Sequence, residues 1–73
     1  MEILSPERPD TAQKVIEYLT IGVRLVLVVD PPAQTISAHR PNDAVKHYRE
    51  PDVVPCDDVV PGFRLPVAAV FEI

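Results

Sequence analysis

Histidine, cysteine and acidic side chains are the groups that could do chemistry in this chain of 73 residues, and they are thinly spread. His39, His47 and Cys56 could be considered as zinc ligands, but they lack the tight pair spacing of zinc motifs. We therefore interpret them as three scattered residues. Asp57 and Asp58 could bind a cation, but adjacent side chains usually diverge, and an acidic loop in an acidic protein is the simpler interpretation.

Three further charged residues have both a chemical and a structural interpretation. Glu2 is the second residue, and Lys14 lies in a predicted helix, so each taken alone is ordinarily a solvated surface residue. Lys14 is also placed to pair with Glu17, three residues further along that helix. Asp30 ends an apolar segment and precedes a proline, a position that usually belongs to a turn. We assign Asp30 a structural role.

The size and charge of the chain restrict its function. A chain of 73 residues allows one small domain, and its independent folding is marginal without a partner or a covalent staple. The single cysteine excludes an intramolecular disulfide and suits a reducing cytosol, so we expect a cytoplasmic protein. The net charge of −4 repels phosphate backbones. Nucleic-acid chemistry would therefore need a local site or a further segment.

The sequence carries no pattern of a targeting or membrane segment. Its N-terminus is acidic and contains proline, without the basic and hydrophobic regions of a signal peptide. The longest apolar run, Leu25 to Val29, is too short to cross a bilayer. We therefore expect no membrane partner.

The N-terminal part predicts a strand followed by a helix. The strand spans residues 1–5, and a proline-containing connection follows at residues 6–9. Asp10 or Thr11 can cap the helix, which ends at residue 21 with Gly22 in the left-handed conformation. The apolar residues at helical spacing form one stripe that must pack on another element: Ala12, Val15, Ile16 and Leu19.

The segment from Arg24 to Val29 predicts a central strand. It is a continuous run of leucine and valine after its first residue, bounded by Gly22 and a turn at 30–32, as expected for a strand covered on both faces. With the preceding strand and helix it forms a βαβ unit, whose two strands should be parallel with a right-handed crossover. One helix and one hairpin are little cover for such a strand, so the sheet looks incomplete and we expect a missing upstream segment.

The remaining residues predict a hairpin and a docked tail. Residues 35–40 alternate like a half-exposed strand, 41–43 form a turn, and the polar segment 45–49 returns as an edge strand. Residues 50–62 are acidic and proline-bearing, which indicates a loop in which Pro61-Gly62-Phe63 turns to bury an aromatic anchor. Part of the tail is predicted to be a short helix from Pro66 to Phe71. The apolar residues expected to dock the tail are Phe63, Leu65, Val67, Val70 and Phe71. The fold class is therefore α+β, a βαβ unit followed by a β-hairpin and a C-terminal tail with a short helix.

An ordered set of short motifs runs through nearly the whole chain. These are Glu2-Ile3-Leu4-Ser5-Pro6, Lys14, Tyr18-Leu19, Gly22-Val23, Val28-Val29-Asp30-Pro31, Thr35-Ile36, His39-Arg40-Pro41 and Pro61-Gly62-Phe63-Arg64-Leu65-Pro66-Val67. No single piece is diagnostic, but the set at these spacings resembles the C-terminal half of the Uma-type (Uma-two) family, described as putative restriction endonucleases. The resemblance implies a truncated restriction-endonuclease-like core of the PD-(D/E)XK nuclease superfamily, with residues 1–73 as a single partial domain.

The chemistry that the resemblance implies is hydrolysis of DNA phosphodiesters. In that superfamily two carboxylates hold a divalent cation, usually Mg²⁺, which stabilises charge on the phosphate and lowers the pKa of bound water. A lysine orients the water or neutralises developing charge. By the resemblance, Glu2 matches the strand carboxylate that is both metal ligand and catalytic residue, and Lys14 matches a catalytic lysine carried on the following helix. Leu4 stands where the usual E-x-K pattern has its lysine.

A second departure from the family pattern concerns the first metal carboxylate. The family's Pro-Asp motif should lie several residues upstream of Glu2, and no such segment is in this sequence. One carboxylate is a poor magnesium site, so we expect the chain alone to be inactive or nearly so. The implied partners are DNA in the intact domain, and either the missing N-terminal half or a second copy of the chain. The alternative is a non-catalytic remnant or interaction module that dimerises through an unpaired strand edge.

Overall fold

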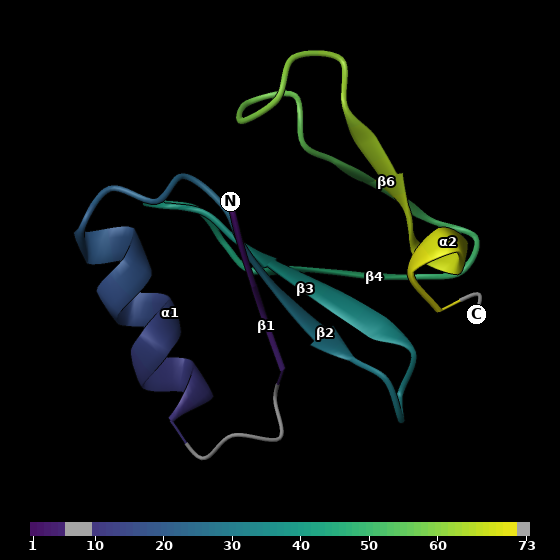
Figure 1. The fold of residues 1–73 in the computed structure, drawn as a ribbon, viewed down its shortest axis with the longest axis horizontal. Helices are drawn as coiled ribbons and strands as arrows, with labels where there is room; N and C mark the ends of the chain where they lie inside the picture. The colour runs from purple at the N-terminus through teal and green to yellow at the C-terminus, as the bar shows by residue number, and fades with distance from the viewer. Residues whose placement is uncertain (6–9, 72–73) are drawn as a thin grey trace.

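Strands and helices alternate along the part of the chain that the structure describes. The computed structural model describes residues 1–5 and 10–71, so the predicted connection at 6–9 lies outside the described residues. The elements in chain order are β1 (Glu2–Leu4), α1 (Thr11–Thr20), β2 (Val26–Asp30), β3 (Thr35–His39), β4 (Lys46–Arg49), β5 (Val53–Pro55), β6 (Arg64–Pro66) and α2 (Val67–Phe71). Figure 1 shows α1 on one side of a twisted sheet, with the β5–β6 hairpin and α2 on its other side.

The main sheet has four strands in the order β1-β2-β3-β4. β1 and β2 are parallel, whereas β2, β3 and β4 are antiparallel neighbours. The predicted parallel strand pair of the βαβ unit and the predicted hairpin are therefore confirmed, and the polar β4 is an edge strand as expected. The turn between β3 and β4 is also confirmed, with Asn42 in the left-handed region at φ 57°.

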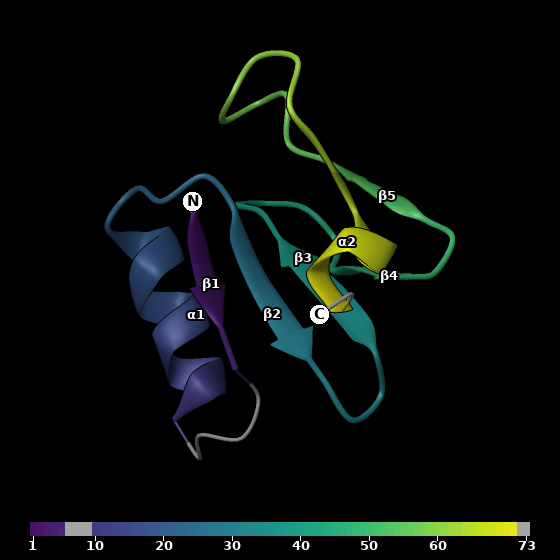
Figure 2. The same ribbon diagram turned by 45° about the vertical axis from the view of Figure 1, so that its right-hand side comes forward.

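The register of β1 on β2 divides their side chains between two faces. Glu2 pairs with Val26 and Ile3 pairs with Leu27, and paired residues of neighbouring strands point to the same face. Glu2 and Val26 therefore lie on the face that α1 covers, and Ile3 and Leu27 lie on the opposite face. The hairpin and α2 pack on that opposite face (Figure 2), where the buried core consists of Leu25, Leu27, Ile36, Ala38, Val54, Cys56 and Val67.

Helix α1 ends in a hydrogen-bonded glycine motif. Gly22 has φ 101°, a conformation that costs a residue with a Cβ more than it costs glycine. Its N–H donates to the carbonyl of Leu19 at 3.3 Å, and the N–H of Val23 donates to the carbonyl of Tyr18 at 2.9 Å. This is the Schellman arrangement, and it satisfies carbonyls that the helix leaves free. The predicted role of Gly22 is confirmed.

The predicted apolar stripe of α1 is only partly correct. Val15 is buried and Leu19 is half-buried against the sheet, but Ala12 is exposed and Ile16 is 59% exposed. Because α1 lies against only the β1–β2 side of the sheet, it buries the Val15 side of the stripe and leaves the adjacent side in solvent. No helix in the described residues is long and apolar enough to span a membrane.

The predicted loop over residues 50–62 is wrong in part, because it contains strand β5. β5 pairs with β6 in a separate two-stranded antiparallel sheet. The prolines of this sheet, Pro55 in β5 and Pro66 in β6, are compatible with pairing because a two-stranded ribbon consists of edge strands only. Val54 in β5 is fully buried, whereas Phe63, which we expected to anchor the tail, is 37% exposed. Val67 takes the anchoring position at 0% exposure, at the start of the confirmed terminal helix.

Arg40 connects the β5–β6 hairpin to the end of β3. Its Nε donates to Asp58 Oδ2 at 2.9 Å, and its Nη2 donates to the carbonyl of Pro55 at 2.6 Å. The hydrogen bond from Arg40 lowers the pKa of the Asp58 carboxyl and raises the pKa of the guanidinium. The Asp58 side chain remains 43% exposed, so solvent screens the ion pair and weakens it.

We predict that Arg40→Met lowers the free energy of unfolding by about 1 kcal/mol at pH 7, measured by urea denaturation. Because the pKa of Asp58 is lowered on folding, its contribution is present above the ordinary pKa of about 4 and is lost as the pH falls through the lowered value. The difference between wild type and variant should therefore shrink near pH 2. Lys14→Met, which removes an exposed pair, is the control and should change the free energy by less than about 0.5 kcal/mol. Equal effects of the two variants would contradict the role of Arg40.

Candidate functional site

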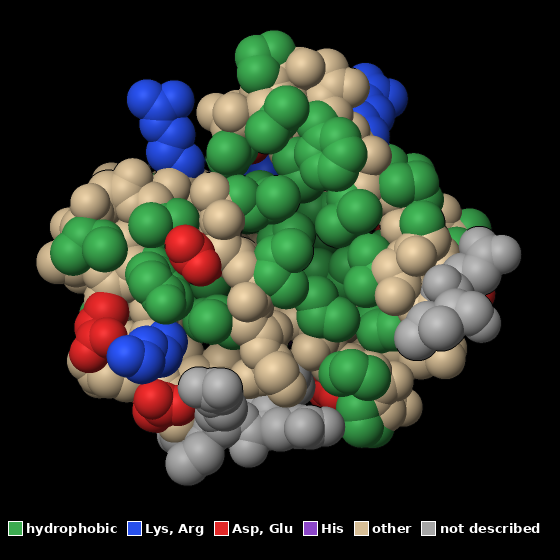
Figure 3. All heavy atoms as spheres, viewed as in Figure 1, with side chains coloured by type: hydrophobic (Ala, Val, Ile, Leu, Met, Phe, Trp, Pro, Cys, Tyr) green, Lys and Arg blue, Asp and Glu red, His purple; other side chains and the backbone are tan. Residues whose placement is uncertain are grey.

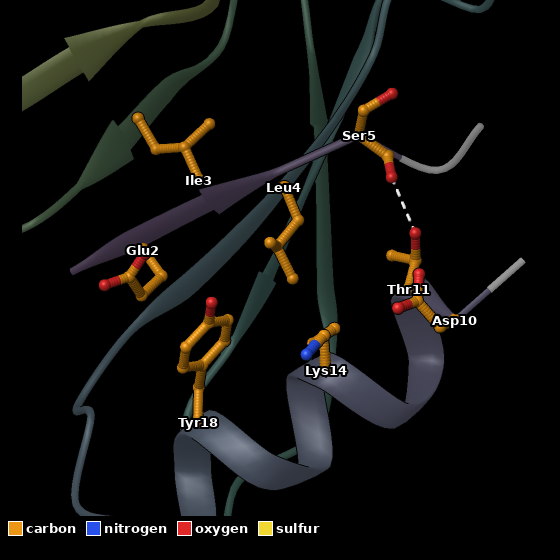
Figure 4. Close-up of a pocket in the computed structure, with 8 residues that line it drawn as sticks. All are labelled: Glu2, Ile3, Leu4, Ser5, Asp10, Thr11, Lys14 and Tyr18. Atoms are coloured by element: carbon orange, nitrogen blue, oxygen red, sulfur yellow. Dashed lines mark hydrogen bonds between the residues drawn. The ribbon is translucent and has the colours of Figure 1, made fainter. Parts of the chain in front are cut away.

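A hollow of about 360 Å³ lies between β1 and the first turns of α1 (Figure 4). The residues that line it are Glu2, Ile3, Leu4, Ser5, Asp10, Thr11, Lys14 and Tyr18. The hollow thus contains both residues that the sequence resemblance assigned to catalysis, Glu2 on the strand and Lys14 on the helix. Its volume lies near the lower end of the range for small-ligand pockets.

Two different periodicities direct side chains into the hollow. Along β1 successive side chains alternate, so those of Glu2 and Leu4 point toward the helix while that of Ile3 points away (Figure 4). Along α1 residues four apart share a face, which brings Lys14 and Tyr18 to the wall opposite β1. The strand and the helix therefore each contribute one predicted residue to the same space.

Among the described residues, Lys14 makes one ion pair, a contact on the surface of the helix. Its Nζ lies 3.5 Å from Glu17 Oε2, and the two side chains are 44% and 51% exposed. The predicted pairing of Lys14 with Glu17 is confirmed. Such an exposed pair stabilises a helix by only about 0.2–0.5 kcal/mol, so the ammonium can leave Glu17 at little cost.

Leu4 stands where the usual E-x-K pattern has its lysine. The side chain of Leu4 points into the hollow from the strand, which is where a lysine two residues after Glu2 would point. Lys14 reaches the same hollow from the helix. The side chains at positions 4 and 14 thus enter the same hollow from facing walls.

Tyr18 and Asp10 also line the hollow, and neither was predicted from the sequence as a site residue. Figure 4 shows the Tyr18 hydroxyl on the Glu2 side of the hollow. Asp10 is the N-cap residue of α1, but its side chain makes no cap hydrogen bond and lines the hollow. The spacing of residues 10, 14 and 18 is the sequence pattern that could have placed Asp10 and Tyr18 beside Lys14, since every fourth residue of a helix lies on one face.

One hydrogen bond connects the two walls at the end of β1. The Thr11 hydroxyl donates to the carbonyl of Ser5 at 2.6 Å (Figure 4). Thr11, one of the two predicted caps, thus uses its hydroxyl to hold the start of α1 to the strand. This contact fixes the separation of β1 and α1 at the end of the hollow that Asp10 borders.

The donor groups that the described residues supply to the hollow do not fit a complete magnesium site. Mg²⁺ requires near-octahedral coordination by oxygen atoms. Among the described residues, the carboxylates of Glu2 and Asp10 line the hollow, and they lie toward its opposite ends with Leu4 and Lys14 between them (Figure 4). Within residues 1–5 and 10–71, no three His, Cys, Asp or Glu side chains are grouped to hold a metal ion. These residues alone can supply only part of such a site.

The histidines and Cys56 are divided by the sheet. His39 and His47 belong to the face that α1 shares, whereas Cys56 is buried in the core on the other face. Burial and the nearby charge of His47 lower the pKa of His39, and burial raises the pKa of the Cys56 thiol. Nδ1 of His47 is hydrogen-bonded to the hydroxyl of Ser37 at 3.0 Å. His39 and His47 are thus residues of the sheet, and Cys56 is a residue of its core.

Two of the remaining acidic candidates, Asp30 and Asp58, have structural partners. Asp30 Oδ1 accepts a long hydrogen bond of 3.5 Å from the N–H of Ala33, in the turn that follows β2. This agrees with the structural role expected for Asp30. Asp58 is bound by Arg40, so it is an ion-paired residue of the hairpin and more than part of an acidic loop.

Comparison with known proteins relates the sequence and fold of this chain to putative nucleases. The sequence model of the family Uma2, described as "Putative restriction endonuclease", matches residues 1–68. The structure is also similar to the crystal structure of a putative nuclease belonging to DUF820 from Anabaena variabilis ATCC 29413, with a TM-score of 0.80 and 26% sequence identity. This match covers 96% of the present chain and 41% of that chain, so the present chain spans less than half of that protein. No curated protein matches the sequence.

We predict weak binding of Mn²⁺, used as a paramagnetic substitute for Mg²⁺, with a dissociation constant on the order of 1 mM or weaker. Amide signals of residues that line the hollow should broaden in an NMR titration, and Glu2→Gln should reduce the broadening because it removes the strand carboxylate. Glu17→Gln, on the same helix but outside the hollow, is the matched control. Stoichiometric micromolar binding that Glu2→Gln abolishes would show instead that the chain's own ligands complete a site.

Proposed function

The chain belongs to the Uma2 family of putative restriction endonucleases, and on that premise we propose that it forms part of a metal-dependent DNA endonuclease. In this proposal Glu2 is the metal-binding carboxylate and Lys14 is the catalytic lysine. The observation that supports it is the position of these two residues on facing walls of one hollow. The similar Anabaena variabilis protein is itself described as a putative nuclease.

Lys14 would act on the charge that develops during hydrolysis. Attack on a phosphodiester places extra negative charge on the phosphate oxygens, and a cation held nearby stabilises it. The long side chain of Lys14 can exchange its exposed contact with Glu17 for a phosphate oxygen or the attacking water. Leu4, beside it, contributes an apolar wall that limits access of water and strengthens such interactions.

The site requires groups beyond those of this chain. When bound, Mg²⁺ would supply stabilisation of phosphate charge and a more acidic water. Its second carboxylate would come from the Pro-Asp strand of the family domain, in an N-terminal portion that residues 1–73 do not include. We infer that the chain alone is catalytically inactive, that DNA binds only to the completed domain, and that the domain works in the reducing cytoplasm.

An interaction module is the second candidate function, and the outer edge of β1 favours it. β1 is at the end of the strand order and is 58% exposed at its central residue, Ile3. An unpaired strand with an exposed apolar side chain can add to another sheet. This candidate predicts a stable assembly without any requirement for metal or DNA.

Plasmid cleavage tests the proposed function directly. The chain would be assayed with Mg²⁺ or Mn²⁺ beside a version extended at its N-terminus through the family's Pro-Asp strand. We expect cleavage by the extended protein only, and a reduction of at least about 100-fold in its Glu2→Ala and Lys14→Ala variants. Lack of cleavage by every version would favour the interaction module, and full activity of either variant would exclude that residue from catalysis.

We further predict that Leu4→Lys partly restores cleavage to the extended Lys14→Ala variant, by about tenfold or more. The reason is that the side chain at position 4 points into the hollow, so a lysine there supplies an ammonium group from the wall opposite α1. Gln13→Lys, which adds the same charge at an exposed position of α1 outside the hollow, is the control and should restore nothing. Equal rescue by both variants would indicate a general effect of charge.

A further inference from the structure

Tyr18 places a hydroxyl in the hollow, and the proposed function gives this hydroxyl no role. The residue lies on α1, is half-buried, and directs its hydroxyl to the Glu2 side of the hollow (Figure 4). A phenol hydroxyl can both donate and accept a hydrogen bond, and a tyrosine that is largely covered usually has a partner for it. The hydroxyl is therefore placed to bind a polar group that enters the hollow.

The neighbouring residues in the hollow do not bind this hydroxyl. In Figure 4 a hydrogen bond joins Thr11 to Ser5, and none joins Tyr18 to any of the other residues drawn. Leu4, on the facing wall, is apolar and has no side-chain group to bind it. Phenylalanine would give the same packing of the ring, so the hydroxyl is what distinguishes a tyrosine at this position.

Lys14 and Tyr18 place two hydrogen-bond donors on one wall of the hollow. They are four residues apart on α1, so their side chains lie on the same face of the helix, about one turn apart. Lys14 supplies an ammonium, which has N–H donors and no acceptor, and Tyr18 adds a neutral O–H donor. Such a pair fits a ligand that carries negative charge on more than one oxygen atom.

The surroundings of the hollow favour a charged ligand over an apolar one. Figure 3 shows acidic and basic side chains close together over α1 and β1, whereas hydrophobic side chains fill the middle of the face, between β1 and the β5–β6 hairpin. The Lys14 side chain is 44% exposed and is paired weakly with Glu17, so it can turn to a bound anion at little cost. An anion that enters from solvent therefore meets both donors.

We propose that Tyr18 is a further catalytic residue, whose hydroxyl donates a hydrogen bond to a non-bridging oxygen of the phosphodiester while Lys14 binds another oxygen of the same phosphate. This inference rests on the proposed function for the identity of the anion. As water attacks phosphorus and the bond to the leaving oxygen breaks, a donor fixed on a helix stabilises the charge on the phosphate oxygens without having to move. Tyr18 keeps its proton throughout, so it acts by hydrogen bonding and not as an acid.

The alternative role for Tyr18 is to orient the carboxylate of Glu2. Both side chains line the hollow, yet no hydrogen bond joins them in Figure 4. The two roles also differ in what they require. A bond from Tyr18 to phosphate persists after the carboxylate is removed, whereas orientation of Glu2 does not, so a Glu2→Gln background separates the two roles.

Inorganic phosphate, added to the chain that carries Glu2→Gln, tests binding without any cleavage. The substitution removes the carboxylate charge that would repel the anion. We expect the NMR signals of Tyr18 and Lys14 to shift with a dissociation constant on the order of 10 mM, and added Tyr18→Phe to weaken binding at least about threefold. Tyr48→Phe is the matched control and should change nothing, because Tyr48 packs against the core on the opposite face of the sheet. Equal effects of the two variants would overturn the proposal, as would shifts no larger than those that sodium chloride causes at the same ionic strength.

Plasmid cleavage by the N-terminally extended protein gives the second measurement. Tyr18→Phe should lower kcat at least about tenfold, because it removes one donor to the phosphate, while Tyr48→Phe should have no effect. Tyr18→Phe should also keep the melting temperature within about 2 °C of the wild-type value, and a larger fall would indicate a structural bond and overturn the proposal. Full activity of Tyr18→Phe would likewise overturn it. Phosphate binding through Tyr18 without cleavage by the extended wild-type protein would contradict only the proposed function.

Discussion

Strand β2 is buried on both of its faces at its start, and the arrangement of the rest of the molecule depends on this. Val26 packs on the α1 side and Leu27 in the core on the other side, and neither is exposed to solvent. Burial of each such side chain stabilises the fold by about 1.5–3 kcal/mol. A shift of β2 by one residue would exchange its two sets of side chains between the faces, so its register is strongly constrained.

The register of β2 also determines what β1 can do. Because Glu2 pairs with Val26, its carboxylate lies on the α1 side, and Ile3 must lie on the core side. The polar and apolar properties of a three-residue strand are thus separated onto two surfaces, a hollow lined by Glu2 and Lys14 and a flank marked by Ile3. Within the described residues both surfaces border the outer edge of β1, the first strand of the sheet.

The hairpin supplies a core that the four-stranded sheet lacks. Val54 and Val67 are fully buried against Leu27, Ile36 and their neighbours, although β5 is short and lies in an acidic, proline-bearing segment. Arg40 connects this layer to β3 by its bonds to Asp58 and to the Pro55 carbonyl. The position of β2, and through it of Glu2, therefore depends in part on contacts made by residues of the β5–β6 hairpin and α2, which are distant in the sequence.

The sequence by itself determined the elements whose signals are local. The apolar run of β2, the glycine that ends α1 at Gly22, and the alternation of β3 were all predicted, because each pattern reflects the backbone geometry of one element. The resemblance also indicated Glu2 and Lys14, although their catalytic role remains a prediction. The strand β5, the exposure of Ile16 and the bond between Arg40 and Asp58 were decided only by the tertiary structure. Local patterns state which residues can be buried or charged, but only the packing of distant segments decides which partner each one meets.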